Sequence, residues 1–242
     1  MLAPAKQGFQ VSYFDSEGAE QRGPLTALVQ VAFESAPPVR GFPSYHRQRN
    51  YPGLWWSATL GRHVGYQSWL ERDQAMLLDF DPRVVGFASQ PFWLLWDDGA
   101  RGRAHAPDWF VRLDDGTGVV IDCRPATRMR PLDQAAFAAT SCACTQAGWR
   151  YRLVHEHDPV VVGNVRWLAG YRHPRPHDAQ VTAALAKAFA QPRGLLDGAS
   201  SVGEPVAVLP TCYHLLWRGV LTADLTVPLH DRTVVRAAGA GA

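Results

Sequence analysis

The chain has 242 residues, of which 47% are hydrophobic and 19% are charged. This composition excludes an intrinsically disordered chain, and the length allows one domain of ordinary size plus a smaller one around a sizeable core. The formal net charge of +2 and the pI near 8.4 are too mildly basic to indicate a nucleic-acid-binding protein by bulk charge alone.

The cysteines and the apolar runs indicate the compartment. Cys123, Cys142, Cys144 and Cys212 form no CxxC pair, so we expect small buried or incidental thiols in a reducing compartment. No run of apolar residues is long enough to cross a membrane, and the N-terminus lacks a secretory signal pattern. We therefore expect a cytoplasmic protein with no membrane partner.

Residues 1–54 are interpreted as an N-terminal extension with basic and aromatic loops. Within them, strands are predicted at Gln10–Phe14 and Leu25–Phe33. Between residues 36 and 70 there is no Asp or Glu, and the basic residues there are Arg40, Arg47, Arg49 and Arg62. Prolines, glycines and aromatic residues are interleaved with these arginines, which predicts loops that contact a DNA backbone and stack on bases. The alternative is that the aromatic side chains cover the rim of a core and the arginines are solvated.

An amphipathic helix is predicted within GYQSWLERDQAMLLDFDP, residues 65–82, because its apolar residues recur at helical spacing and Pro82 follows. Glu71 lies on this helix and, judged by itself, is most simply a surface glutamate. Strands are predicted next at Arg83–Ala88 and Pro91–Trp96, followed by an arginine-rich loop.

The most informative stretch is HAPDWFVRLDDGTGVVIDCRP, residues 105–125. Two apolar runs, Trp109–Leu113 and Val119–Cys123, flank a DDGTG turn that is typical of a β-hairpin. Counting back from the turn brings Asp108 roughly opposite Asp122, and the alternation of side chains points Asp122 and Arg124 the same way. Two carboxylates and a cation are therefore expected at one end of the hairpin.

Two interpretations of this hairpin end remain open. Carboxylate oxygens suit a hard divalent cation such as Mg²⁺, with Arg124 facing the phosphate or water that the metal activates. The alternative is an ordinary polar hairpin end with a salt bridge.

The rest of the chain completes a mixed sheet flanked by helices. We predict a helix at Leu132–Ala147, a strand at Trp149–Val154 and a helical segment at Val160–Tyr171. Residues 172–178 are interpreted as a linker with two prolines. Beyond the linker, residues 179–236 are predicted to form three short helices and a hairpin, which is the arrangement of a winged-helix domain. The helices are predicted at Ala179–Ala190, Pro192–Val202 and Glu204–Arg218, and the hairpin at Val220–Val235.

Taken together, SWLE at 68–71, PD at 107–108 and DCRP at 122–125 resemble the PD-(D/E)xK nuclease superfamily. In particular, SWLERDQAMLLDFDPRVVGFASQP at 68–91 and NVRWL at 164–168 resemble segments of TnsA-like endonuclease subunits of heteromeric transposases. The resemblance covers residues 55–171, and a C-terminal winged-helix domain agrees with that family's architecture. It implies a restriction-endonuclease-like α/β fold.

The resemblance also implies an activity, a site and partners. It implies hydrolysis of one DNA strand at transposon ends, together with a DDE-type transposase and an AAA+ ATPase regulator. Glu71, Asp108 and Asp122 would hold one or two Mg²⁺ ions, for which Mn²⁺ can substitute, and Arg124 would take the place of the basic residue. This sequence has Arg124 where the superfamily usually has Lys, and Gln67 where related sequences often carry another Glu.

Two further functions stay open from the sequence. The same fold with weak or no catalysis would be a subunit that bridges DNA and the other transposition proteins. A stand-alone defence nuclease is the third possibility. A neighbouring pair of genes for a DDE transposase and an AAA+ ATPase would disfavour this last one.

Overall fold

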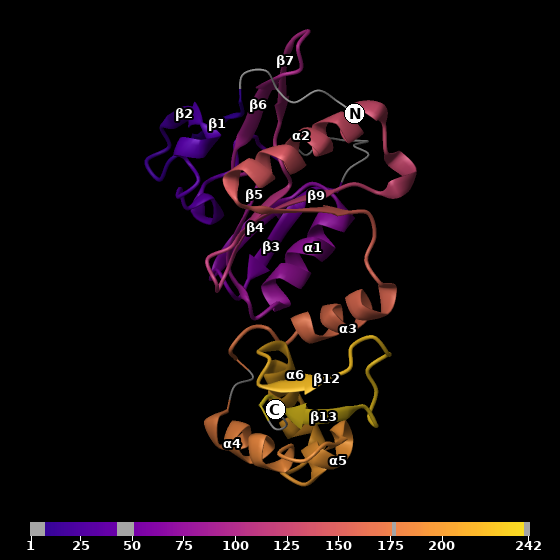
Figure 1. Cartoon of the computed structure of the whole chain (residues 1–242). Coiled ribbons are helices and arrows are strands. Elements are labelled where there is room, and N and C mark those ends of the chain that lie inside the picture. Colours follow the sequence, from indigo (N-terminus) through magenta and orange to yellow (C-terminus); the bar gives the residue numbers. More distant parts are fainter. Residues whose placement is uncertain (1–7, 43–50, 176–177, 240–242) are drawn as a thin grey trace. The chain divides into compact units, whose positions relative to one another are not determined.

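The computed structural model describes residues 8–42, 51–175 and 178–239, which form a mixed α/β protein (Figure 1). The predicted α/β class is confirmed. The chain divides into two compact units, one made of residues 1–78 and 83–156 and the other of residues 79–82 and 157–242. The division after residue 156 places the helix that follows it with the second unit, whereas the sequence suggested a linker at 172–178.

In the part of the first unit that the structure describes there are two four-stranded sheets and one separate hairpin. One sheet has the order β2-β1-β6-β7 and is antiparallel throughout, and the hairpin pairs β3 with β4. The other has the order β10-β9-β8-β5, in which only β9 and β10 are parallel. The strands are β1 Gln10–Phe14, β2 Glu20–Pro24, β3 Gly53–Ser57, β4 Arg62–Tyr66, β5 Val84–Ser89, β6 Trp93–Asp97, β7 Gly102–His105, β8 Trp109–Leu113, β9 Gly118–Cys123 and β10 Arg150–Val154.

Two helices cover opposite faces of the sheet that contains β8 and β9. Helix α1 (Trp69–Phe80) contributes Ala75 and Leu78 to a core with Trp109 and Ile121. Helix α2 (Pro131–Ala147) contributes Ala143 and Cys144 to a second core, which also contains Phe110 and Val120. Because alternate residues of a strand point to opposite faces, each strand supplies both cores. This two-sided burial explains why every residue of β9 is buried.

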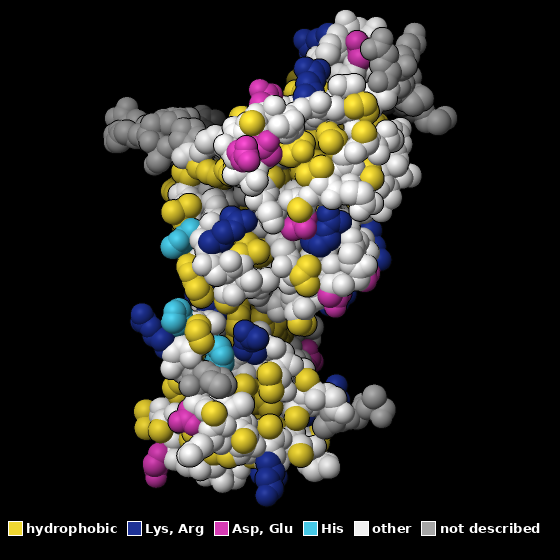
Figure 2. Space-filling view, turned by 90° about the vertical axis from the view of Figure 1, so that its left-hand side faces the viewer, with side chains coloured by type: hydrophobic (Ala, Val, Ile, Leu, Met, Phe, Trp, Pro, Cys, Tyr) yellow, Lys and Arg dark blue, Asp and Glu magenta, His cyan; other side chains and the backbone are white. Residues whose placement is uncertain are grey.

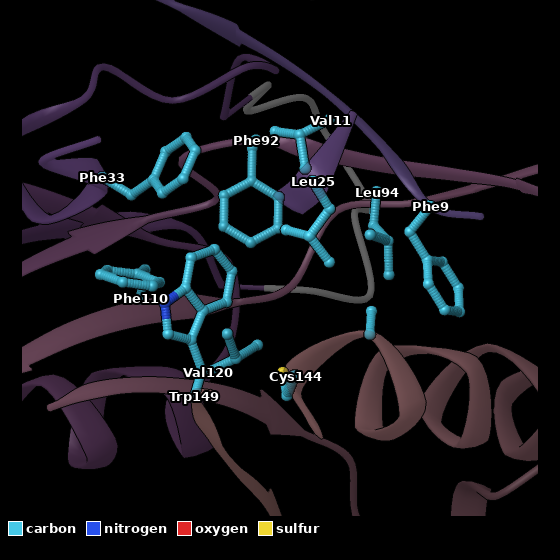
Figure 3. Close-up of a cluster of buried hydrophobic side chains, with 11 residues drawn as sticks. Phe9, Val11, Leu25, Phe33, Phe92, Leu94, Phe110, Val120, Cys144 and Trp149 are labelled. Atoms are coloured by element: carbon cyan, nitrogen blue, oxygen red, sulfur yellow. The ribbon is translucent and has the colours of Figure 1, made fainter. Parts of the chain in front are cut away.

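An aromatic cluster fills the core on the α2 side (Figure 3). The Phe33 ring lies 4.8 Å from Phe92, 5.6 Å from Phe110 and 5.8 Å from Trp149, measured between ring centroids. Figure 3 shows these four rings gathered together, with Cys144 approaching from α2. Phe33 belongs to the N-terminal segment, so this part of the chain completes the core of the first unit.

Three predictions of local structure were wrong in this unit. Leu25–Phe33 is not a strand: 3₁₀ turns at Leu25–Ala27 and Phe33–Ser35 direct two single side chains, Leu25 and Phe33, into the core. The supposedly loop-rich region contains the β3–β4 hairpin, whose turn uses Gly61 at φ 64°. The arginine-rich loop contains β7, an edge strand that pairs only with β6 among the described residues.

The described residues of the second unit form four helices and a three-stranded antiparallel sheet of order β11-β13-β12. Leu185, Phe189, Leu195 and Leu215 are among its most buried side chains. The predicted helices and the pairing of two late strands are present, while the winged-helix assignment stays a prediction. The elements are α3 Pro159–Ala169, α4 Ala179–Ala188, α5 Leu195–Ser200, α6 Pro205–Trp217, β11 Arg193–Gly194, β12 Leu221–Ala223 and β13 Val234–Ala237.

Asn164 of α3 joins its helix to the loop before β13. Its Nδ2 donates to the carbonyls of Leu225 and Val227, each at 2.8 Å, and its Oδ1 accepts from the amide of Leu229 at 2.9 Å. An amide side chain with both ends bonded to backbone specifies one loop conformation. The Asn of the NVRWL segment therefore has a structural role inside this unit.

All four cysteines are free, and three of them are buried. Among the described residues, no helix is both long and apolar enough to cross a membrane.

Candidate active site

The β8–β9 hairpin brings two acids to one end of the sheet. Its register pairs Trp109 with Ile121, and the turn closes with Gly116 at φ 82°. One residue further from the turn, Asp108 stands just outside the ladder, opposite Asp122 of β9. The predicted hairpin and the predicted proximity of its two ends are therefore confirmed.

Asp108 is partly buried at this end of the hairpin. Its Oδ2 accepts a hydrogen bond from the amide of Cys123 at 2.7 Å. Burial raises the pKa of Asp108 well above its ordinary value, and the nearby carboxylates of Glu71 and then Asp122 raise it further. A partly buried acid that two neighbouring carboxylates repel is costly to ionise unless a cation joins it.

Glu71 is buried, with 6% of its surface exposed. Its Oε2 accepts from the amide of Gln67 and its Oε1 from the hydroxyl of Ser68, each at 2.8 Å. Ser68 Oγ in turn accepts from the amide of Glu71 at 3.2 Å, so the Ser-x-x-Glu pattern acts as a helix-capping pair. Burial raises the pKa of Glu71, opposed by those hydrogen bonds and by the charge of Arg40. The alternative that Glu71 is a surface glutamate is wrong.

Asp122 is 1% exposed, and each of its oxygens has a partner. The Oδ1 atom lies 2.8 Å from His105 Nε2 on β7, and Oδ2 accepts from the Tyr151 hydroxyl on β10 at 2.8 Å. Burial and then the Asp122 charge raise the pKa of Tyr151, so this phenol stays a hydrogen-bond donor. Asp122 shares its side of β9 with Val120, which belongs to the core on the α2 side, whereas Glu71 comes from α1 on the other face.

Arg124 does not face the acids in this conformation. Its Nε and Nη2 donate to Asp133 Oδ2 at 3.2 and 2.7 Å, and Asp133 also accepts from the backbone and side chain of Arg130. These bonds close the N-terminus of α2, and the hydrogen bonds of Arg130 are the main cause of the lowered pKa of Asp133. The prediction that Arg124 points with Asp122 toward a metal is not met in this conformation.

We expect Asp133→Ala to lower the melting temperature by about 2–4 °C, because a lost helix cap costs about 1 kcal/mol and the chain is of moderate size. Because the pKa of Asp133 is lower in the folded protein than in the unfolded chain, its stabilisation is fully present at a pH above the ordinary Asp pKa. It is lost as the pH falls through the pKa that Asp133 has in the folded protein. The difference from wild type should therefore shrink in acid. Thermal melts across pH measure it, with Glu204→Ala as control, since Glu204 makes no side-chain cap bond at α6. An equal loss in both variants would contradict the capping role.

The sequence interpretation gave no role to Gln90, which lies beside the acids. Gln90 is fully buried, and at φ 47° it is the one non-glycine among the described residues with positive φ. Its amide donates to the carbonyl of Asp108 at 3.0 Å, and its Oε1 accepts from Arg40 Nε at 2.9 Å. Its Nε2 is buried with no hydrogen-bond partner among the described residues. A strained backbone with an unsatisfied buried donor is typical of functional sites, and Gln90 in the Gln-Pro pair was the available sequence signal.

The acids as placed do not form a complete metal cage. Among the described residues, no group of three or more His, Cys, Asp or Glu is arranged to hold a metal ion. Glu71 and Asp108 nevertheless interact closely enough for the Glu71 charge to raise the pKa of Asp108. Two carboxylates that destabilise each other's charge have the donor chemistry that a hard divalent cation such as Mg²⁺ requires. The pair would supply part of such a site, with water or substrate oxygens as the remaining ligands.

The predicted DNA-contacting arginines fall into three groups. Arg47 and Arg49 lie outside the described residues. Arg62 is exposed on β4, and Arg40 is bonded to Gln90 although its surface is exposed. On the face seen in Figure 2, Lys and Arg side chains lie apart from one another and do not form one continuous basic stripe.

An exposed aromatic pair lies at the start of α1. The Tyr51 and Trp69 rings are stacked with centroids 5.5 Å apart, and they are 59% and 49% exposed. The Arg72 guanidinium lies 4.3 Å from the centroid of Trp69. Flat, solvent-facing rings beside a guanidinium can stack on nucleic-acid bases.

The second unit has a hollow of its own. A cavity of about 330 Å³ lies among α3, α5, α6 and the loop before β13, with Trp167, Leu196 and Tyr213 in its lining. Asp231 is the one acid among its lining residues. The paired acids that hydrolytic metal chemistry needs are therefore found at the hairpin end and not in this cavity.

Comparison with protein-family models and with curated proteins finds no match for this chain.

Proposed function

We propose that this chain is a Mg²⁺-dependent DNA endonuclease that hydrolyses one strand at transposon ends. The observation that carries the proposal is the pair of the buried Glu71 and the partly buried Asp108, one from the first turn of α1 and one from the residue just before β8. The Ser-x-x-Glu and Pro-Asp motifs, which are far apart in the sequence, supply these two side chains. Their meeting in one place supports the resemblance on which the proposal rests.

The finer assignments belong to the same proposal. The β5, β8, β9 and β10 sheet between α1 and α2 would be the restriction-endonuclease-like core, and residues 179–236 of the second unit would be the winged-helix domain. The chain would act in the cytosol as one subunit of a heteromeric transposase, with a DDE-type transposase and an AAA+ ATPase regulator. These partners follow from the resemblance.

Each residue has a definable part in the chemistry. A bound Mg²⁺ would polarise the scissile phosphate and acidify the attacking water. Glu71 and Asp108 would hold the ion through carboxylate oxygens. Asp122 would join them by exchanging its bond to His105 or Tyr151 for the metal, since both of its oxygens are engaged in this conformation. Arg124 would likewise have to leave Asp133 before it could reach a phosphate.

Exposed groups around the site supply contacts for DNA. Trp69 lies two residues before Glu71 on the first turn of α1, and the two side chains leave opposite sides of the helix. The stacked pair of Trp69 and Tyr51 is therefore about one helix diameter, on the order of 10 Å, from the acids. This distance corresponds to about three nucleotides of a strand. Bases next to the cleaved nucleotide would stack there, while Arg62 contacts the backbone.

The test is nicking of a supercoiled plasmid that carries the transposon ends, with Mg²⁺ or Mn²⁺ and the two partner proteins. We expect Glu71→Gln to reduce the rate by about 100-fold or more and to weaken metal binding in calorimetry, because a charged ligand is lost. The matched control is Asp73→Asn on the same helix, where the acid bonds Arg72 at 2.6 Å. Wild-type cleavage and metal affinity in Glu71→Gln would contradict the metal-site assignment.

A catalytically weak subunit that bridges DNA and the partner proteins is the second candidate. The bonds of Arg124 to Asp133 and of Asp122 to Tyr151 favour it, because both withdraw predicted catalytic groups from the acid pair. In that case the plasmid would be bound and assembled with the partners but not nicked. A stand-alone defence nuclease would instead cut DNA without either partner.

A further inference from the structure

Two arginines compete for the role of the cation in the proposed site. The sequence pattern selects Arg124, but its guanidinium bonds Asp133 at the N-terminus of α2. Arg40 comes from a segment without a recognised motif, yet it contacts a neighbour of each acid. Its Nε bonds Gln90, whose amide bonds the Asp108 carbonyl, and its Nη2 lies 3.4 Å from Gln67 Oε1, whose amide bonds Glu71 Oε2. These contacts separate the arginine expected from sequence from the one that is linked to both acids.

Gln90 places Arg40. Its Oε1 accepts from Arg40 Nε at 2.9 Å, and its carbonyl accepts from the amide of Val39 at 2.9 Å. The same residue donates its amide to the carbonyl of Asp108 at 3.0 Å. One buried residue, with a left-handed backbone at φ 47°, thus ties the arginine segment to the aspartate.

Arg40 also reaches solvent. Its surface is exposed, its guanidinium lies 6.0 Å from the Trp93 ring centroid, and its Nη2 is 3.4 Å from Gln67 Oε1. These contacts are with neutral groups. The guanidinium is therefore fixed at one end by a neutral acceptor and keeps its charge available for an anion from solvent.

We propose that Arg40, positioned by Gln90, is the cation that neutralises the scissile phosphate at the Glu71–Asp108 pair, in place of Arg124. This inference rests on the proposed nuclease function and assigns its basic residue. A guanidinium is not deprotonated in proteins, so Arg40 stabilises charge on the phosphate oxygens and accepts no proton. Gln90 is a positioning residue, because it acts through Arg40.

The sign of one measurement separates this role from a structural one. A fixed positive charge beside two carboxylates opposes binding of a second cation, so Arg40→Gln should bind Mn²⁺ about 3- to 10-fold more tightly. The same variant should cleave about 100-fold more slowly at saturating DNA, in the range seen when one charge-stabilising donor is lost. Tighter metal binding with slower cleavage is not expected from a site that has merely lost its shape.

The experiment uses the full chain with its partners. Calorimetry with Mn²⁺ and plasmid nicking at saturating DNA are measured for wild type, Arg40→Gln and Arg124→Gln, with Arg150→Gln at an exposed position of β10 as the matched control. We expect Arg150→Gln to leave Mn²⁺ affinity and cleavage unchanged, and Arg124→Gln to lose much less of the cleavage rate than Arg40→Gln. Gln90→Gly retains a residue that tolerates positive φ but removes the partner of Arg40, and we expect it to slow cleavage without weakening Mn²⁺ binding.

Three results would overturn the inference. Weaker Mn²⁺ binding in Arg40→Gln would make Arg40 a structural residue. Unchanged Mn²⁺ affinity with a slower rate only below DNA saturation would make it a simple backbone contact. A large loss in Arg124→Gln alone would return the role to Arg124. If wild type itself neither bound Mn²⁺ nor nicked DNA, the proposed function would fail. This outcome is distinguishable from the other three, because in each of them wild type is active.

Discussion

Asp108→Asn is expected to abolish metal-dependent cleavage while making the metal-free protein more stable. Asn keeps an oxygen that can accept from the Cys123 amide, now at 2.7 Å from Asp108 Oδ2, but it cannot carry the charge that a metal requires. A loss of at least about 100- to 1000-fold in the nicking rate is the range for removing a main electrostatic contribution. Plasmid nicking at matched protein and metal concentrations measures it.

The stability gain follows from the raised pKa of Asp108, which burial causes first and Glu71 next. The folded protein holds this proton more tightly than the unfolded chain, so the stabilisation is present at low pH and is lost as the pH rises. Above the ordinary Asp value of about 4, wild type should lose stability that Asp108→Asn retains. Thermal melts of the two metal-free proteins measure this difference, and each 1 kcal/mol of added stability raises the melting temperature of a chain of this size by about 2–4 °C.

Magnesium should reverse this order. Bound metal stabilises wild type by mass action, and Asp108→Asn should gain nothing from it. Asp115→Asn is a suitable control, because Asp115 is exposed in the hairpin turn and accepts from the Thr117 amide at 2.9 Å. Retained nicking in Asp108→Asn, or equal Mg²⁺ stabilisation in both proteins, would remove Asp108 from the metal site.

In contrast to Asp108→Asn, Asp122→Ala should make the protein less stable. Its removal leaves the Tyr151 hydroxyl and the His105 ring without the acceptor they now reach at 2.8 Å. Partly buried groups left unsatisfied cost about 1–3 kcal/mol, so we expect a lower free energy of unfolding in urea by about that amount. Sequence reasoning that treats the two hairpin acids alike would expect both variants to be neutral or stabilised.

Tyr151→Phe distinguishes a structural from a catalytic Asp122. This change removes one hydrogen bond and frees one Asp122 oxygen, and the acid itself remains. If Asp122 joins the metal, Tyr151→Phe should keep or increase the nicking rate, whereas Asp122→Ala should lose it at temperatures where the variant is folded. Full activity of folded Asp122→Ala would show that Asp122 only supports the sheet.

Elements with a local cause were predictable from the sequence. The β8–β9 hairpin follows from alternating apolar residues around a DDGTG turn, and α2 from its apolar content and Gly148, which takes φ 71° at the C-terminal cap. In the same way α1 follows from helical spacing after Ser68. Each of these is decided by the conformational preferences of neighbouring residues.

Burial and side-chain direction were decided by tertiary structure. Nothing near Glu71 in the chain distinguishes it from a solvated glutamate; its burial results from packing at the α1 face of the sheet. The alternation of side chains predicts that Asp122 and Arg124 point to the same side. Their partners nevertheless come from different elements: Asp122 bonds His105 and Tyr151, whereas Arg124 bonds Asp133. Arg40 bonds Gln90, 50 residues later, and the Gln90 amide in turn bonds the carbonyl of Asp108. Motif spacing thus identified the candidate acids, whereas only the tertiary structure decided the partners of each charged side chain, because electrostatic partners depend on distance in space and not along the chain.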